Sequence, residues 1–85
     1  RSHLSAIRSC YEKQLLKSPT LEGRVHLAFT IDGQGKVAAA SIDTSTLASP
    51  EVERCIVNAV SAMTFPVPRG GGSIRVTYPF IFATQ

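Results

Sequence analysis

An alternating stretch that runs directly into a glycine-rich loop constrains this 85-residue chain most. Its apolar members, each separated by one polar or small residue, are Val25, Leu27, Phe29 and Ile31. Side chains on a β-strand point to opposite faces with a period of two, so the stretch predicts a strand with one apolar face. Residues 32–35 read Asp-Gly-Gln-Gly, and these glycines can adopt the positive φ angles of a hairpin loop. The rest of the chain is expected to cover the apolar face of this hairpin or to extend its edge.

The second strand of the hairpin is expected over residues 36–44. Its apolar residues, Val37, Ala40 and Ile42, break strict alternation by one position. A β-bulge at residues 38–39 would restore the alternation and direct Ala40 and Ile42 toward the core.

Two other stretches have the period of a helix. Residues 3–17 predict a first helix, and residues 49–63 predict a second, which opens with the Ser-Pro-Glu pattern typical of a helix N-terminus. The apolar stripe of the first helix contains Leu4, Ile7, Cys10, Tyr11 and Leu15. That of the second contains Val52, Cys55, Ile56, Ala59, Val60 and Met63. Arg8, Glu12 and Lys13 are expected mainly on the other side of the first helix.

The C-terminal third predicts one more strand. Residues 65–68 (Phe-Pro-Val-Pro) must be extended because each proline fixes φ and lacks a donor, and residues 69–72 are expected to form a flexible loop. Alternation over residues 73–83 then predicts the strand. The order α-β-β-α-β fits an α+β, two-layer sandwich, with a three-stranded antiparallel sheet of order 2-1-3 and two helices on one face. Six residues are expected to share one core: Phe29, Ile31, Ile56, Val60, Phe80 and Phe82.

Composition argues against several classes of function. The net charge is +3, but the nine Lys and Arg residues are scattered singly, whereas nucleic-acid-binding proteins usually gather theirs on one face. His3 and His26 are the only histidines, and neither has a carboxylate at metal-ligand spacing. No catalytic motif is present, and the glycines of residues 70–72 lack the ending of a phosphate-binding loop. We therefore expect no enzyme activity, no cofactor, no metal and no nucleic-acid partner.

The two cysteines lie on the apolar stripes of the two predicted helices. If both helices pack on the same face of the sheet, Cys10 and Cys55 can meet, and we expect them to form a disulfide. A disulfide would imply an oxidising compartment. The alternative is two independent buried thiols, which are common in protein cores.

A succession of short segments resembles the TonB C-terminal domain family, in the variant found at the ends of myxobacterial gliding-motility proteins. They cover almost the whole chain in order: residues 10–12 (Cys-Tyr-Glu), 21–25 (Leu-Glu-Gly-Arg-Val), 29–32 (Phe-Thr-Ile-Asp), 35–37 (Gly-Lys-Val), the helix 52–63, and 65–68 (Phe-Pro-Val-Pro). The tyrosine-proline pair usual at the end of the first helix is missing, and Tyr11-Glu12 stands in the corresponding region. Partner choice is therefore expected to differ from that of the iron-siderophore systems.

The resemblance implies a role for the chain and a place in the cell. Residues 1–85 would be a single periplasmic domain excised from the C-terminus of a longer protein anchored in the inner membrane. Such domains capture a segment of an outer-membrane barrel or other envelope protein as an added strand. They transmit force from an inner-membrane proton-channel complex, which is engaged through the N-terminal part of the protein, and they have no catalytic residues or cofactor. Transport and gliding motility both remain open as the process served.

The last strand is the expected partner-binding edge, over Ile74, Arg75, Val76, Thr77, Tyr78 and Pro79. Backbone N–H groups alternate in direction along a strand, so the backbone positions of Arg75, Thr77 and Pro79 face the same way. Pro79 has no N–H to donate to a neighbouring strand, so we expect the backbone groups of this set to face outward. Their free backbone groups could pair with an incoming strand. One alternative is a plain edge that Pro79 and Arg75 protect. Another is a structural envelope module that forms a homodimer through this edge or binds peptidoglycan-associated proteins without transmitting force.

Overall fold

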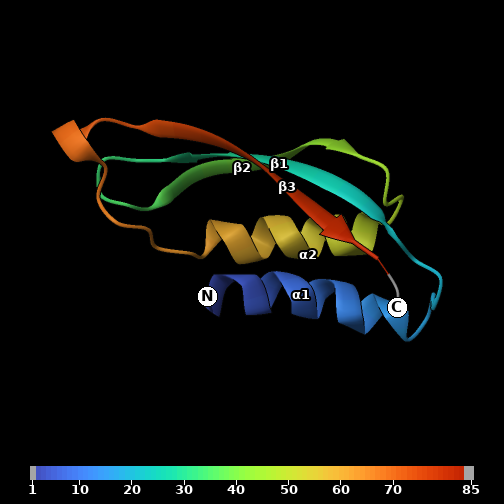
Figure 1. Cartoon of the computed structure of the whole chain (residues 1–85). Coiled ribbons are helices and arrows are strands. Elements are labelled where there is room, and N and C mark those ends of the chain that lie inside the picture. The colour runs from blue at the N-terminus through green and yellow to red at the C-terminus, as the bar shows by residue number, and fades with distance from the viewer. Residues whose placement is uncertain (1, 84–85) are drawn as a thin grey trace.

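The computed structural model describes residues 2–83, with side chains from residue 4 onward. In chain order the elements are α1 (Ser2–Leu15), β1 (Gly23–Ile31), β2 (Val37–Ser45), α2 (Pro50–Ser61), a 3-10 turn η1 (Arg69–Gly71) and β3 (Ile74–Phe82). The strands form one antiparallel sheet of order β2-β1-β3, and both helices lie on the same face of it (Figure 1). The predicted α+β class and strand order are confirmed. No helix in the described part of the chain has the length and hydropathy needed to cross a bilayer.

The core forms between the apolar face of β1 and the two helices. Its buried side chains are Ile7, Cys10, Tyr11, Val25, Leu27, Phe29, Ile31, Leu47, Val52, Ile56 and Val60. Four of the six predicted core residues are among them. Phe80 and Phe82 are only half-buried and pack against the core from β3. Leu4, which the helical period assigns to the core, is 52% exposed, because it lies at the margin of the core beside Phe80 of β3.

The loop between β1 and β2 is held by its own backbone and by Asp32. The Asp32 carboxylate accepts hydrogen bonds from the amides of Gln34 (2.9 Å) and Lys36 (3.0 Å). Both bonds lower the pKa of the Asp32 carboxyl below its usual value, and the bond from the Lys36 amide has the larger effect. Gly35 has a φ of 83°, and its carbonyl accepts a hydrogen bond of 2.7 Å from the Phe65 amide. A side chain at Gly35 would both strain the backbone and overlap the Phe65 carbonyl, so this position requires glycine.

β2 contains two irregularities in its pairing with β1. Thr30 and Ile31 pair with Ala39 and Val37, which leaves Ala38 as an extra residue. The predicted bulge at residues 38–39 is therefore confirmed. A second irregularity, which the alternation in the sequence does not predict, leaves Asp43 unpaired between Ile42 and Thr44.

Two predicted segments differ in detail. The first helix ends at Leu15 rather than at residue 17, because the amides of Lys17 and Ser18 turn back to the Gln14 carbonyl (3.0 and 2.9 Å) ahead of Pro19. Residues 69–71 form a 3-10 turn rather than a flexible loop, in which the Gly71 amide donates to the Pro68 carbonyl at 3.2 Å. The predicted start of the second helix is confirmed, since the Ser49 hydroxyl accepts a hydrogen bond of 3.3 Å from the Val52 amide.

A disulfide joins the two helices. Cys10 of α1 is bonded to Cys55 of α2, with a Cα–Cα distance of 5.7 Å that lies within the usual range. The bond closes a loop over a sequence separation of 45 residues, which contains β1, β2 and the start of α2.

Reduction of this disulfide is expected to destabilise the domain strongly. Closing a loop of this length contributes about 4 kcal/mol in the chain-entropy model, which is large for a core this small. The melting temperature, followed by circular dichroism with and without reductant, should fall by more than about ten degrees. The variant with both Cys10→Ser and Cys55→Ser should melt like the reduced protein and should not respond to reductant.

Phe29→Ala tests the assignment of the core face of β1. Phe29 is 8% exposed and stacks on Phe65 with a ring-centroid distance of 5.7 Å. The substitution should lower the free energy of unfolding by about 3–5 kcal/mol because it leaves a cavity in the core. Leu16→Ala is the control, since Leu16 is 87% exposed and its truncation should change stability by less than about 0.5 kcal/mol. Equal effects of the two changes in urea unfolding would contradict the assignment.

Candidate functional site

β3 forms one edge of the sheet and carries all six residues predicted to bind a partner. It pairs with β1 over nine successive residue pairs, from Gly23 with Phe82 to Ile31 with Ile74, and the register does not shift. The side chains of Arg75, Thr77, Pro79 and Ile81 are exposed on the face of the sheet away from the helices. β3 is therefore a long, regular edge strand.

The hydrogen bonds of Arg24 fix which backbone groups of β3 face outward. The Arg24 carbonyl accepts a hydrogen bond from the Thr46 amide (2.8 Å), and the Arg24 amide donates one to the Thr46 hydroxyl (2.9 Å), so the backbone N–H and C=O of Arg24 point toward β2. The direction of these backbone groups alternates from one residue of a strand to the next. The backbone groups of the odd-numbered residues of β1 therefore point toward β3. Their partners are Ile74, Val76, Tyr78, Phe80 and Phe82. The backbone groups of Arg75, Thr77, Pro79 and Ile81 consequently face away from the sheet.

The two edges of the sheet differ in their ability to pair with another strand. The bulged positions at Ala38 and Asp43 interrupt the pairing of β2, and bulges are a common way to protect an edge from further pairing. β3 has no such interruption, and its outward N–H groups are missing only at Pro79. Of the two edges, β3 is the better template for an added strand.

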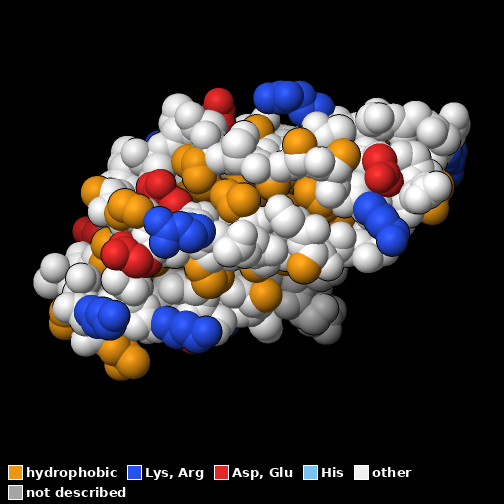
Figure 2. Space-filling view, turned by 180° about the vertical axis from the view of Figure 1, so that it is seen from behind, with side chains coloured by type: hydrophobic (Ala, Val, Ile, Leu, Met, Phe, Trp, Pro, Cys, Tyr) orange, Lys and Arg blue, Asp and Glu red, His pale blue; other side chains and the backbone are white. Residues whose placement is uncertain are grey.

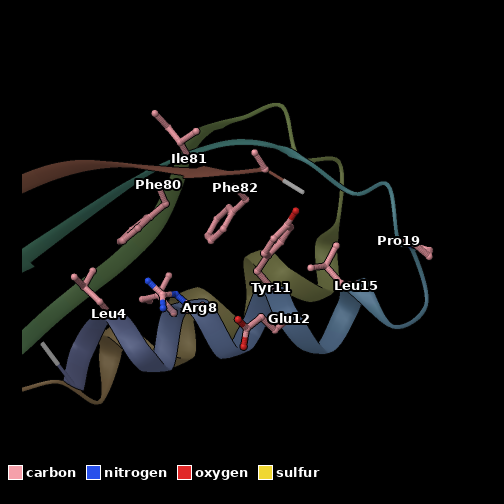
Figure 3. Close-up of a pocket in the computed structure, with 11 residues that line it drawn as sticks. Leu4, Arg8, Tyr11, Glu12, Leu15, Pro19, Phe80, Ile81 and Phe82 are labelled. Atoms are coloured by element: carbon pink, nitrogen blue, oxygen red, sulfur yellow. The ribbon is translucent and has the colours of Figure 1, made fainter. Parts of the chain in front are cut away.

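A groove of about 840 Å³ runs between α1 and β3 (Figure 3). Its walls are Leu4, Ile7, Arg8, Tyr11, Glu12, Leu15 and Pro19 on one side and Phe80, Ile81, Phe82 and Ala83 on the other. Phe80 and Phe82 point from β3 toward α1, whereas Ile81 points away from it (Figure 3). We call this hollow the α1–β3 groove. It lies on the helix side of the outer edge of β3.

An apolar cavity of about 280 Å³ adjoins the α1–β3 groove. It shares Leu4, Ile7 and Phe80 with the groove and is completed by Phe29, Val60, Met63, Phe65 and Tyr78. Leu4 and Tyr78 at its margin are 52% and 47% exposed. This combination of an open edge and an unfilled apolar hollow beneath it can accept the alternate side chains of an extended peptide.

Sequence reasoning missed the part of the site that α1 contributes. The helical period places Arg8 and Glu12 on the side of α1 away from the core, but both line the α1–β3 groove. Lys13, from the same predicted set, instead lines a hollow beside the disulfide with Arg54 and Asn58 of α2. The period of a helix shows which residues share a face, and it does not show how far a neighbouring strand extends over that face.

Tyr11 connects α1 to β3 and to the segment that precedes β1. Its ring stacks on Phe82 with a centroid distance of 4.7 Å, and its hydroxyl donates a hydrogen bond to the Leu21 carbonyl just before β1. Burial, and to a lesser extent the negative charge of Glu22, raises the pKa of this hydroxyl above its usual value. Tyr11 therefore holds the C-terminal half of α1 against β3.

No group of three or more His, Cys, Asp or Glu side chains among the described residues could hold a metal ion. His26 Nδ1 lies 2.9 Å from the Thr44 hydroxyl on the open face of the sheet. Figure 2 shows the Lys and Arg side chains on one face of the molecule as separate groups, so this face has no continuous basic strip.

The raised pKa of Tyr11 predicts an alkaline loss of stability. The folded protein keeps the proton at pH values where the unfolded chain loses it. The contribution of the protonated hydroxyl is therefore complete below about pH 10 and is lost as the pH rises toward the folded-state pKa. Tyr11→Phe should cost about 1 kcal/mol at neutral pH through the lost hydrogen bond. Its melting temperature should fall less than that of the wild type as the pH rises from about 9 to about 11, a range around the ordinary tyrosine pKa. Tyr78→Phe, which removes the other tyrosine, should keep the alkaline loss of the wild type.

Comparisons with known proteins give structural neighbours only. No family model matches the sequence, and no curated protein matches it. A solution structure of the Helicobacter pylori TonB C-terminal domain aligns over 99% of this chain and 82% of that chain, with 19% identity and a TM-score of 0.66. A second, shorter one aligns over 93% and 86%, with 24% identity and a TM-score of 0.68.

The third neighbour comes from another organism. The solution structure of the Pseudomonas aeruginosa TonB C-terminal domain aligns over 85% of this chain and 75% of that chain, with 25% identity and a TM-score of 0.63. The resemblance to the gliding-motility variant stays a prediction, since these neighbours come from H. pylori and P. aeruginosa. The sequence resemblance and the three structures agree on the architecture, and the chain has the fold of the TonB C-terminal domains.

Proposed function

We propose that this domain binds an extended segment of another cell-envelope protein by adding it as a strand to the outer edge of β3. The observation that carries the proposal is the regular edge of β3, with the backbone groups of Arg75, Thr77 and Ile81 directed outward over an open groove. Strand addition takes its affinity from such backbone groups and its specificity from pockets for alternate side chains. Residues 74–79, the predicted partner-binding residues, form the first two-thirds of this edge.

The cellular role follows from the fold by analogy. The domain would lie in the periplasm as the C-terminal part of a protein anchored in the inner membrane. Its partner would be an outer-membrane barrel or another envelope protein. It would transmit force from a proton-channel complex engaged through the N-terminal part of the protein, in transport or in gliding motility. The disulfide between Cys10 and Cys55 supports an oxidising compartment of this kind.

Thr77→Pro is expected to abolish peptide binding and to leave the fold intact. The change removes an outward N–H and places a ring in the path of the added strand, while the bonds of β3 to β1 are untouched. The chain has no tryptophan, so binding of a peptide that alternates threonine and valine around a single tryptophan can be followed by the emission of that tryptophan. Circular dichroism checks the fold.

Two control variants separate the edge from its side chains. Thr77→Ala keeps the outward N–H and should bind the peptide like the wild type. Ala40→Pro makes the same change on β2, where Ala40 lies opposite Phe29 and its amide faces away from β1, and it should also bind normally. Normal binding by Thr77→Pro, or loss of binding only in Ala40→Pro, would contradict the proposal.

The alternative function uses the same edge without force transmission. A structural envelope module could pair β3 with β3 of a second copy or bind peptidoglycan-associated proteins. Exposed regular edges favour such self-association. Sedimentation that shows a concentration-dependent dimer, which Thr77→Pro dissociates, would favour this alternative over capture of a partner segment.

A further inference from the structure

Three side chains of α1 form a row along the α1–β3 groove: Leu4, Arg8 and Glu12. In Figure 3 they follow one another along the helix, with Arg8 between the other two. All three are exposed. Within residues 4–83, the side chains of Arg8 and Glu12 form no ion pair and no hydrogen bond. The row is therefore free to meet another chain.

The spacing of this row matches the spacing of a strand. Residues four apart on a helix are separated by about 6 Å along its axis. Side chains on one face of a strand repeat every 6.6–6.8 Å, roughly the same step. α1 and β3 also run in the same direction, since Leu4 and Ile7 line the apolar cavity with Phe80, and Tyr11 further along α1 stacks on Phe82. Three successive groove-facing side chains of an added strand would thus lie opposite Leu4, Arg8 and Glu12 in turn.

We propose that the site selects strands whose three groove-facing side chains are, in order, apolar, acidic and basic. The apolar side chain would enter the 280 Å³ cavity beside Leu4, the acidic one would pair with Arg8, and the basic one with Glu12. The reverse order of charges would place like charges together in the groove. This inference rests on the proposed function, because it specifies the partner of the same edge. Strands parallel or antiparallel to β3 can both satisfy the order.

The row favours a separate partner over a second copy of this chain. β3, the edge available for self-pairing, reads Ile-Arg-Val-Thr-Tyr-Pro-Phe-Ile-Phe and contains no acidic residue. A second β3 added to the edge therefore has nothing to pair with Arg8. The occupant we infer is an extended segment of another protein that carries alternating apolar, acidic and basic residues.

Two peptides of identical composition test the order of charges. The first reads Thr-Trp-Thr-Asp-Thr-Lys-Thr, and the second exchanges its Asp and Lys. Each is also made in reversed sequence order, because the direction of the added strand is not fixed. Tryptophan emission reports binding, since the protein has no tryptophan of its own. In one of the two directions, the first peptide should bind the wild type about two- to fivefold more tightly than its charge-exchanged counterpart, the range of a partly exposed ion pair.

Exchange of the charges on α1 should reverse this preference. The double variant Arg8→Glu, Glu12→Arg keeps the net charge and should bind the charge-exchanged peptide more tightly. Lys13→Glu is the control, because Lys13 lies on the same helix but lines the hollow beside the disulfide, and it should keep the wild-type preference. A preference that the double variant does not reverse, or that Lys13→Glu abolishes, would overturn the inference.

The remaining outcomes separate this inference from the proposed function. If all the peptides bind equally and Thr77→Pro abolishes their binding, the charge order is wrong and strand addition stands. If no peptide binds in either direction, both proposals are overturned. If sedimentation shows a dimer that closes the groove and excludes the peptides, the occupant is a second copy of the chain and the inference fails.

Discussion

The register between β3 and β1 is the constraint on which the rest of this structure depends. Because Arg24 directs its backbone toward β2, the odd-numbered residues of β1 bond to β3, and the nine-pair register then fixes which groups of β3 are left over. The same register turns Phe80 and Phe82 toward α1 and Ile81 away from it. A slip by one residue would exchange the two faces of β3. One pairing pattern thus sets both the free edge and the wall of the groove.

The helical layer fixes the wall that α1 contributes to the groove. α1 is fixed to α2 by the disulfide at Cys10 and to β3 by the stacking of Tyr11 on Phe82. Its N-terminal half lies beside the apolar cavity, and Leu4 remains half exposed there. In the proposed complex, a wall fixed in this way would require little ordering when a peptide enters the groove, which would favour binding. The row of Leu4, Arg8 and Glu12 would then add a directional pattern to a backbone interaction that by itself is indifferent to sequence.

The asymmetry between the two edges of the sheet is the structural reason for proposing a site on β3 and not on β2. The extra residues Ala38 and Asp43 interrupt the regular pairing of β2 with β1, whereas the register between β3 and β1 does not shift. Bulges of this kind limit unwanted pairing. The structural neighbours share the fold at 19–25% identity, so the architecture tolerates extensive change in side chains. Specificity is therefore expected to lie in the groove residues rather than in the fold.

Local patterns in the sequence determined the elements and their order. Alternation gave β1 and β3, Ser49 and Pro50 marked the start of α2, and Pro79 indicated an edge strand. These signals are readable because they depend on neighbouring residues alone. Only the tertiary structure decided that α1 lies under the outer edge of β3, which exposes Leu4 and brings Arg8 and Glu12 into the groove. Helical periodicity ranks the faces of a helix, but the position of the helix relative to the sheet decides how much of each face is covered.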